Sequence, residues 1–286
     1  MTYKHPAVGP LAGIRVVDVT SVISGPGAMG LLADQGADVI KVEPPQGDIM
    51  RHRGDDPNFT PGFVTVNRGK RSVVLDLKNP GAAPVLWKLI ATADVFAQNF
   101  RPGVIERLGF DADTVLARHP EIVYLSISGV GRVGPYVKKR VYDPVVQALS
   151  GFAEIQADPV SKRPKMIRTL IADKTTAVFA SQAVLAALLA RERSGKGQHV
   201  EVAMLDTMVA YIWPEAMAPF TKIGAEDMDA ASTLHDMIFP TADGYITLGA
   251  VSDKEWYALC HAIQCPDLID DPRFVTASLR NKNRQE

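Results

Sequence analysis

The chain has little cysteine, no excess of charge of either sign and no long apolar run. Its 286 residues include two cysteines, Cys260 and Cys265, which excludes a disulfide framework. The formal net charge is -1, so the basic excess of a nucleic-acid-binding protein is missing. No stretch reaches the roughly 18 uninterrupted apolar residues of a membrane span, and residues 1–10 lack the apolar core of a secretory signal. We therefore expect a cytoplasmic protein that binds neither nucleic acid nor membrane.

The two cysteines lie close to His261, which raises the question of a metal site. A structural zinc site needs about four ligands, and no second ligand pair lies near Cys260, His261 and Cys265. We predict no metal centre, and we expect both thiols to lie on an apolar helix face in the core.

What the sequence does contain is a regular alternation of apolar β-branched runs and helical stretches. Ile14–Thr20 is typical of a strand; a glycine-rich turn at Gly25–Gly30, a helical stretch to Gln35 and a second strand at Ala37–Glu43 follow. Further strands are predicted at Ser72–Leu77, Asp94–Gln98, Ile122–Ser128 and His199–Met204. Strands separated by helices indicate an α/β fold with a Rossmann-like parallel sheet.

Changes in amino-acid composition along the chain indicate two domains. Asp173–Arg193 is the longest helical pattern and is apolar on nearly all faces, which predicts burial in the core or at a subunit interface. The sequence becomes loose and polar after Tyr211, and a strand-like run returns at Gly244–Val251. We expect a large α/β domain at 1–210, a linker at 211–235 and the start of a smaller α+β domain at 236–286, truncated by the end of the chain.

A glycine pattern after the first strand suggests a dinucleotide site. Gly25, Gly27 and Gly30 match G-x-G-x-x-G, and Glu43 ends the next strand at about the distance expected of a ribose-binding acid. However, Pro26 removes a backbone N–H that would serve a pyrophosphate, and no hydride-transfer residues follow. The pattern supports the β-α-β architecture more than it supports NAD binding.

Three basic clusters point to an anionic ligand. They consist of Arg51, Arg53, Arg68, Lys70 and Arg71; of Arg101 and Arg107 after Asn99-Phe100; and of Lys138, Lys139 and Arg140 before Tyr142-Asp143. Guanidinium and ammonium groups suit phosphates, and loops at the carboxyl ends of parallel strands are where phosphate sites form. A solvated surface explains any single residue better, but three clusters on a neutral protein favour a site.

Asp173 is a further candidate because it follows the apolar run Leu170-Ile171-Ala172 and opens the long helix. Aspartate is a preferred N-cap residue, so a purely structural role is one interpretation. A helix N-terminus also favours an ionised carboxylate, which covalent catalysis needs. From the residues alone, both interpretations stay open.

Eight short motifs in one order cover nearly the whole chain: Leu11–Asp18, Gly36–Glu43, Asn67–Ser72, Asn99–Gly103, Tyr142–Gln147, Ala172–Asp173, Ser194–Gln198 and Val202–Asp206. In this order they resemble the class III, CaiB/BaiF-type CoA-transferases, the family of formyl-CoA transferase. The resemblance implies coenzyme A or acyl-CoA as substrate, a small carboxylic acid as second substrate, no metal, and an interlocked homodimer.

The resemblance also implies a mechanism and a set of contacts. Asp173 would attack the acyl-CoA thioester to give an acyl anhydride and CoA thiolate; the thiolate would return to form an aspartyl-CoA thioester, which the acceptor acid resolves in reverse. The positions implied to contact coenzyme A are Ile23, Ser24, Asn67, Arg68, Lys70, Arg71, Asn99, Phe100, Arg101, Arg107, Arg140, Tyr142 and Asp143.

Departures from the family pattern bear on the substrate. Ile23 stands where formyl-CoA transferase has a glutamine, and Pro44 replaces an arginine that contacts CoA, which argues against formyl-CoA and oxalate. One rival is an α-methylacyl-CoA racemase, which needs a histidine at Tyr142; tyrosine, with a pKa near 10, is a poor base at neutral pH. A second rival is a CoA-binding fragment without turnover.

Overall fold

The computed structural model describes residues 8–52, 56, 60–158, 160–221, 223–224, 237–283 and 286. By internal contacts the chain divides into two compact units, Met1–Trp213 and Pro214–Glu286. The candidate Arg53 lies outside the described residues, as do residues 225–236 of the expected linker.

The first unit is built on a six-stranded sheet in the order β3-β2-β1-β4-β5-β6, and every neighbouring pair is parallel. The strands are β1 (Arg15–Asp18), β2 (Asp38–Glu43), β3 (Arg71–Val74), β4 (Val95–Gln98), β5 (Val123–Ser128) and β6 (Gln198–Ala203). The predicted parallel sheet is therefore confirmed. The strand order reverses between β1 and β4, and ligands of doubly wound sheets bind at such a point.

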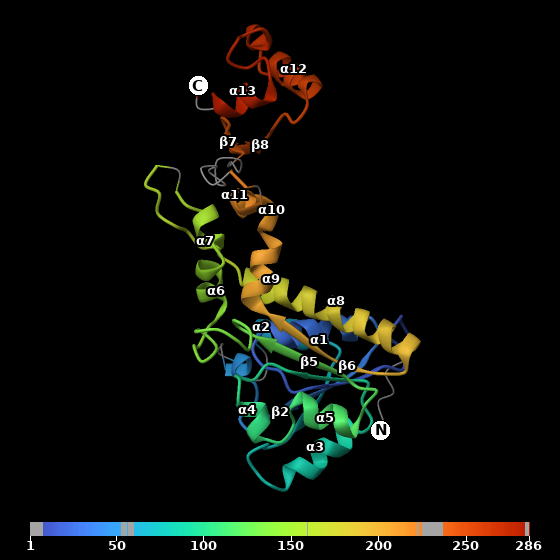
Figure 1. The fold of residues 1–286 in the computed structure, drawn as a ribbon. Helices are drawn as coiled ribbons and strands as arrows, with labels where there is room; N and C mark the ends of the chain where they lie inside the picture. Colours follow the sequence, from blue (N-terminus) through green and yellow to red (C-terminus); the bar gives the residue numbers. More distant parts are fainter. Residues whose placement is uncertain are drawn as a thin grey trace. The chain divides into compact units, whose positions relative to one another are not determined.

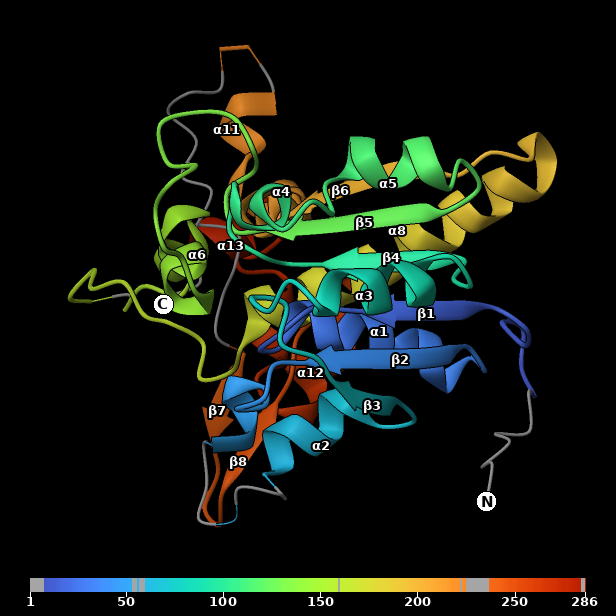
Figure 2. The same ribbon diagram turned by 90° about the horizontal axis from the view of Figure 1, so that it is seen from below.

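Helices cover both faces of the sheet, as Figure 1 and Figure 2 show. On one face, α1 (Ser24–Asp34) and α8 (Ile171–Ser194) bury an apolar cluster against the strands. On the other, α3 (Ala82–Ile90), α4 (Val104–Arg107) and α5 (Ala112–Arg118) bury a second cluster. Neighbouring strand residues such as Val95 and Phe96 alternate between the two clusters because side chains of a strand point to opposite faces. Each fully buried side chain of this size stabilises the fold by about 1.5–3 kcal/mol.

The glycine pattern belongs to helix α1, so the predicted turn at Gly25–Gly30 is wrong. A Cβ at Gly27 would lie 3.2 Å from the Ala177 Cβ of α8, and one at Gly30 would lie 2.9 Å from the carbonyl oxygen of Val66 in α2 (Pro61–Asn67). The glycines therefore let α1 pack closely against two helices. Glu43 is likewise occupied, since it holds the Arg51 guanidinium through two hydrogen bonds of 2.7 and 2.8 Å.

The long helix α8 begins two residues earlier than predicted. Its N-cap is Leu170 and Asp173 is the third helical residue, so the N-cap interpretation of Asp173 is wrong. The helix buries one face in the core, whereas Val178 and Leu189 are more than half exposed on the other. The predicted burial in the core therefore holds for one face of α8, which carries Ala177, Ala180 and Val184. Burial of the other face at a subunit interface stays a prediction.

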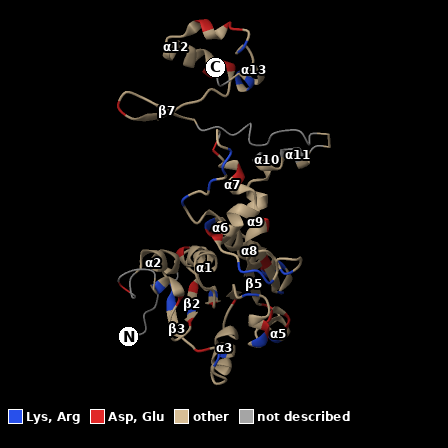
Figure 3. Ribbon diagram, turned by 90° about the vertical axis from the view of Figure 1, so that its left-hand side faces the viewer, with Lys and Arg blue, Asp and Glu red and all other residues tan. Residues whose placement is uncertain are grey.

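The remaining helices of the first unit are α6 (Asp143–Leu149), α7 (Phe152–Ile155), α9 (Met204–Tyr211) and the 3-10 helix η1 (Ile49–His52), and α10 (Trp213–Ala216) spans the division between the units. Within the described residues, no helix has the length and apolar character that crossing a bilayer requires. Figure 3 shows Lys and Arg spread over several segments, including β3 and the chain beside α6.

The second unit contains α11 (Ala218–Thr221), an antiparallel hairpin of β7 (Ile238–Pro240) and β8 (Tyr245–Thr247), and α12 (Asp253–Ala262), η3 (Pro266–Ile269) and α13 (Ala277–Lys282). Cys260 is buried in α12, as predicted, but Cys265 follows that helix and is exposed, so its predicted core position is wrong. Among the described residues, no group of three metal-ligating side chains occurs.

Candidate active site

A cavity of about 280 Å³ lies at the carboxyl ends of the central strands. Its walls come from the segments that follow β1, β4 and β5, together with the segment before α6, the first turn of α8 and the start of α9. Because the strand order reverses between β1 and β4, the cavity lies at the switch point of the sheet. Seven predicted site residues line it: Ser24, Asn99, Phe100, Arg101, Arg140, Tyr142 and Asp173.

Asp173 lies in the cavity wall with 8% of its surface exposed. The hydroxyl and the backbone N–H of Ser24, the first residue of α1, both act on this carboxylate by lowering its pKa. The backbone N–H of Asp173 donates to Asp143 Oδ2 at 3.0 Å, and Gln147 Nε2 donates to the other oxygen of Asp143 at 2.6 Å. The N-termini of α1, α6 and α8 therefore meet at this carboxylate.

The pKa of Asp173 is raised to about 6, chiefly because burial disfavours the charged carboxylate and secondly because Asp143 carries a like charge nearby. The hydroxyl and the N–H of Ser24 act in the opposite direction, since both stabilise the ionised form. Burial therefore raises the pKa of Asp173 further than the Ser24 groups lower it. At pH 7 the group is still mostly ionised, and it is more basic, hence a better nucleophile, than an ordinary aspartate.

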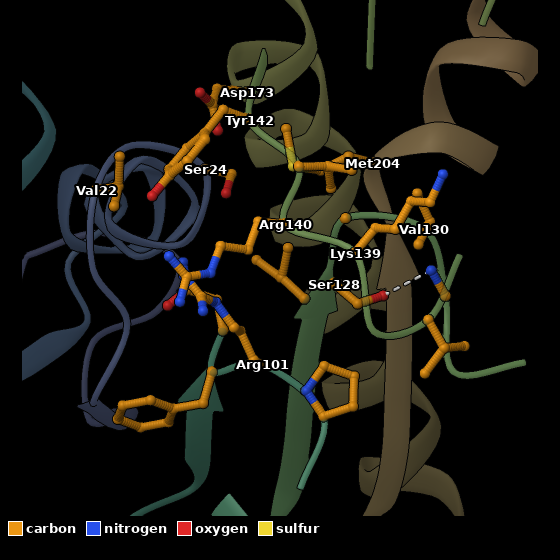
Figure 4. A pocket seen from close by; sticks show the side chains of 18 of the residues that line it. Val22, Ser24, Arg101, Ser128, Val130, Lys139, Arg140, Tyr142, Asp173 and Met204 are labelled. Carbon is orange, nitrogen blue, oxygen red and sulfur yellow. Dashed lines mark hydrogen bonds between the residues drawn. The ribbon is translucent and has the colours of Figure 1, made fainter. Parts of the chain in front are cut away.

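Three basic residues line the cavity: Lys139 and the two arginines, Arg101 and Arg140. Both arginine side chains are exposed, and within the described part of the chain neither forms an ion pair with a carboxylate. Figure 4 shows Asp173, Ser24 and Tyr142 close together in one part of the cavity. Arg140 and Arg101 lie in another part of it. Two unpaired guanidinium groups in one cavity repel each other, so the arrangement favours an anionic ligand such as a phosphate.

A second cavity of about 600 Å³ adjoins the first, and Ser21 and Phe100 line both. Its walls include the apolar Leu75 and Leu77 and the basic His52 and Lys78, at the carboxyl ends of β2 and β3. The sequence prediction missed this group. The sequence could have indicated these residues, because residues that follow a parallel strand lie at the edge of the sheet where ligands bind.

Several predicted contacts lie elsewhere. Ile23 packs into a small apolar cluster with Met50 and Phe63, and Asp143 is fully buried beneath Asp173. Arg107 is exposed on α4, and in the described structure neither it nor Ile23 or Asp143 lines either cavity.

The Asn67–Arg71 segment is occupied by protein partners. Arg68 and Arg71 form ion pairs with Asp34 and Asp38. The side chain of Lys70 is buried, and its Nζ lies 2.8 Å from Asp18 Oδ2, 2.7 Å from the carbonyl oxygen of Pro26 and 3.0 Å from Asn67 Oδ1. These contacts give the segment a role in holding β1, α1 and β3 together, and its surroundings in the described structure offer no support for a ligand contact.

Together, the fold and the cavity define an α/β protein in which a buried carboxylate and exposed basic side chains share a cavity at the switch point of a doubly wound sheet. The chain belongs to the CoA-transferase family III, whose family model matches residues 11–286. It is 35% identical over 292 residues to a succinate–glutarate CoA-transferase of Agrobacterium fabrum, with 97% of this chain and 72% of the relative covered. It is 36% identical over 286 residues to an acetyl-CoA:oxalate CoA-transferase of Acetobacter aceti, covering 96% and 72%.

Solved structures give the same result. A crystal structure of the Rv3272 protein of Mycobacterium tuberculosis matches with a TM-score of 0.86 at 36% identity, covering 98% of this chain and 76% of that one. A CaiB/BaiF family protein of Brucella suis matches with a TM-score of 0.81 at 32% identity, covering 97% and 75%. The resemblance drawn from the sequence motifs is therefore confirmed.

Proposed function

We propose that this protein moves coenzyme A from an acyl-CoA donor to a carboxylic acid, with Asp173 as the covalent nucleophile. The observation that carries the proposal is the position of Asp173: a buried carboxylate in the wall of a cavity that also holds two arginines with no carboxylate partner among the described residues. A carboxylate that served only to stabilise the N-terminus of a helix would need neither the cavity nor the arginines.

The two adjoining cavities suggest how coenzyme A binds. We place the pantetheine arm in the 280 Å³ cavity, so that the thioester reaches Asp173, and the adenosine end in the 600 Å³ cavity. Arg101 and Arg140 then contact phosphates as planar donors. Phe100, which lines both cavities, offers an apolar surface between the two ends of the ligand.

The proposed chemistry begins with the ionised Asp173 attacking the thioester carbonyl. The acyl group becomes bonded to the carboxylate oxygen as a mixed anhydride, and the CoA thiolate leaves; a thiol pKa of about 8.5 makes it a good leaving group. The thiolate then attacks the aspartyl carbonyl, releasing the donor acid and leaving an aspartyl-CoA thioester. The acceptor carboxylate reverses the sequence, so the thioester is conserved without ATP.

The acyl end of the cavity is lined near Asp173 by Val22, Val141 and Met204. Succinate, glutarate and oxalate appear in the names of the relatives, so similarity alone selects no single acid for this chain. Within the described residues no histidine lines this cavity, which favours transfer over the two-base chemistry of a racemase.

We also propose that the protein acts as a homodimer. The exposed face of α8 carries Val178, Phe179 and Leu189, and an apolar face of this kind is stabilised when a second copy covers it.

The covalent step is tested by mixing the protein with acyl-CoA and hydroxylamine and then mapping peptides by mass spectrometry. We expect hydroxylamine to trap the activated carboxyl as a hydroxamate at Asp173. The same treatment without acyl-CoA is the control. A protein that binds acyl-CoA but stays unmodified would support the alternative of a CoA-binding chain without turnover.

A second prediction concerns Ser24. Replacing Ser24 with alanine removes the hydroxyl donor that stabilises ionised Asp173, so the pKa of Asp173 should rise from about 6. Because the nucleophile must be ionised, the rate of adduct formation falls as pH drops through this pKa, and in Ser24→Ala the fall should begin at higher pH. The measurement is kcat/KM against pH. The 3′-phosphate of coenzyme A also titrates near pH 6, but its limb would not move with the substitution, so an unmoved limb contradicts the assignment.

A further inference from the structure

The loop from Thr20 to Ile23, between β1 and α1, holds an unusual backbone conformation. Val22 has a φ of 73°, in the left-handed region that β-branched residues rarely adopt. Its side chain lines the cavity beside Ser24, as Figure 4 shows. Strained residues of this kind persist only where the surroundings hold them in place, and they gather at functional sites.

Hydrogen bonds hold Thr20, Ser21 and Val22 of this loop. The Thr20 N–H donates to Asp18 Oδ1 at 2.9 Å. Asn99 brackets the next residue, because its Oδ1 accepts from the Ser21 N–H at 2.9 Å and its Nδ2 donates to the Ser21 carbonyl at 2.8 Å. The Val22 N–H points to Asp48 Oδ1 at 3.4 Å.

The least expected of these holders is a buried ion pair. Lys41, in the middle of β2, is 1% exposed, and its Nζ lies 3.1 Å from Asp48 Oδ2. The same Nζ donates to the carbonyl oxygen of Thr20 at 2.9 Å. Among the described residues, Asp48 Oδ2 accepts no hydrogen bond. Its negative charge is balanced by the Lys41 ammonium group. Burying two charges is unfavourable unless they are paired with good geometry. The positions of Lys41 and Asp48 are therefore tightly constrained.

We propose that the Lys41–Asp48 ion pair is a positioning device for the proposed transferase: it fixes the Thr20–Ile23 loop, and through the loop it places the Ser24 donors against Asp173. The inference rests on the proposed function for its kinetic consequences. In the described structure Lys41 and Asp48 lie in the wall of the 600 Å³ cavity and not of the 280 Å³ cavity that contains Asp173. Their effect on Asp173 must therefore pass through the Thr20–Ile23 loop and Ser24.

The connection from Thr20 to Ser24 is short and tightly packed. A Cβ added at Gly25 would lie 2.4 Å from the Thr20 Cβ, so the first turn of α1 rests directly on Thr20. Lys41 holds the Thr20 carbonyl and Asp48 accepts from the Val22 N–H, so the pair defines both ends of the turn that precedes Ser24. A shift of Thr20 therefore moves the start of α1, and with it the Ser24 hydroxyl and N–H that lower the pKa of Asp173.

The test compares Lys41→Met with the double variant Lys41→Met/Asp48→Asn. The single variant leaves Asp48 charged, buried and unpaired, so it should lower the unfolding midpoint. The double variant removes both charges, which restores stability, while Thr20 still lacks its donor. A matched control is Arg191→Met/Asp94→Asn, which deletes a partly buried ion pair of 2.9 Å at the opposite end of the strands.

The readouts are the unfolding midpoint, kcat and KM for acyl-CoA, and the pKa of Asp173 from carbon NMR of labelled aspartate, with Asp173→Asn to assign the signal. In both Lys41 variants we expect kcat to fall about tenfold with KM within twofold, and the pKa of Asp173 to rise by about one unit, the effect of losing a hydrogen bond to a charged group. The control should leave kcat and the pKa of Asp173 unchanged.

Recovery of kcat and of the Asp173 pKa together with stability in the double variant would show a merely structural pair and overturn the inference. An Asp173 pKa that does not move in Lys41→Met would do the same. The NMR readout needs no turnover, so if the wild-type protein transfers no CoA, the proposed function fails while the positioning inference is still decided by the titration.

Discussion

Replacing Asp173 with asparagine should lower the rate of CoA transfer by at least about 10⁴-fold, the size of effect seen when a covalent nucleophile is removed. Asparagine has nearly the same shape, but its amide cannot form the anhydride or the thioester. Binding should survive, because the arginines and the adjoining cavity stay in place. The measurements are steady-state transfer and the dissociation constant for coenzyme A by calorimetry.

The matched control for this substitution is Asp113→Asn. Asp113 also lies in the first turn of a helix, α5, but it is exposed and does not line either cavity in the described structure. Its replacement should change the transfer rate less than twofold. Substantial transfer by Asp173→Asn would mean that the acid attacks the thioester directly, with Asp173 as a structural residue only.

Asp173→Asn should also increase stability, and the pKa explains the sign. The pKa is raised in the folded state to about 6, above its ordinary value, so the ionised carboxylate destabilises the fold once the pH exceeds that ordinary value. The amide carries no charge at any pH. The gain should therefore be present at pH 8 and shrink as the pH falls below 6.

The parallel sheet could be predicted from the sequence because fully buried strands appear as continuous apolar runs. Val16, Phe96 and Tyr124 all occur in such runs, and each is fully buried. The position of the glycines could not be predicted. G-x-G-x-x-G after a strand is typical of a phosphate-binding turn, but here Gly27 and Gly30 lie inside α1 because other helices approach there.

The candidate site also contains residues that could be predicted from the sequence and residues that could not. Asn99, Arg101 and Arg140 follow or precede elements whose ends meet at the switch point, and the topology alone brings them into one cavity. The charges of Arg68 and Lys70 are equally visible in the sequence. Their partners are not, because Asp34 and Asp18 are distant in the chain and become neighbours only when the sheet forms.

The functional importance inferred for Lys41 was least accessible from the sequence. A lysine in the middle of an apolar strand is ambiguous, since its charge could face solvent at a sheet edge. Only the fold places Nζ between Thr20 and Asp48. Similarly, the raised pKa of Asp173 depends on burial and on the nearby charge of Asp143, which lies thirty residues earlier.

Replacing Arg101 or Arg140 with alanine should weaken binding of coenzyme A by about ten- to hundredfold each, since a hydrogen bond to a charged group is worth about 1.5–3 kcal/mol. In the described structure neither guanidinium has a carboxylate partner. Removing either one therefore leaves no buried carboxylate without a partner, and the unfolding midpoint should not change. The measurement is calorimetric titration with coenzyme A and with dephospho-CoA, at low and at high salt.

The contrast with Arg68→Ala and Arg71→Ala makes this result decisive. Those arginines were predicted contacts as well, but each already neutralises an aspartate, so their loss should change the affinity less than twofold. If Arg68→Ala weakened binding as much as Arg101→Ala, coenzyme A would have to displace Asp34 and occupy the edge of the sheet near α2, away from Asp173. Affinity lost only in the Arg101 and Arg140 variants, with a smaller salt dependence in each, would place the phosphates in the cavity that contains the nucleophile.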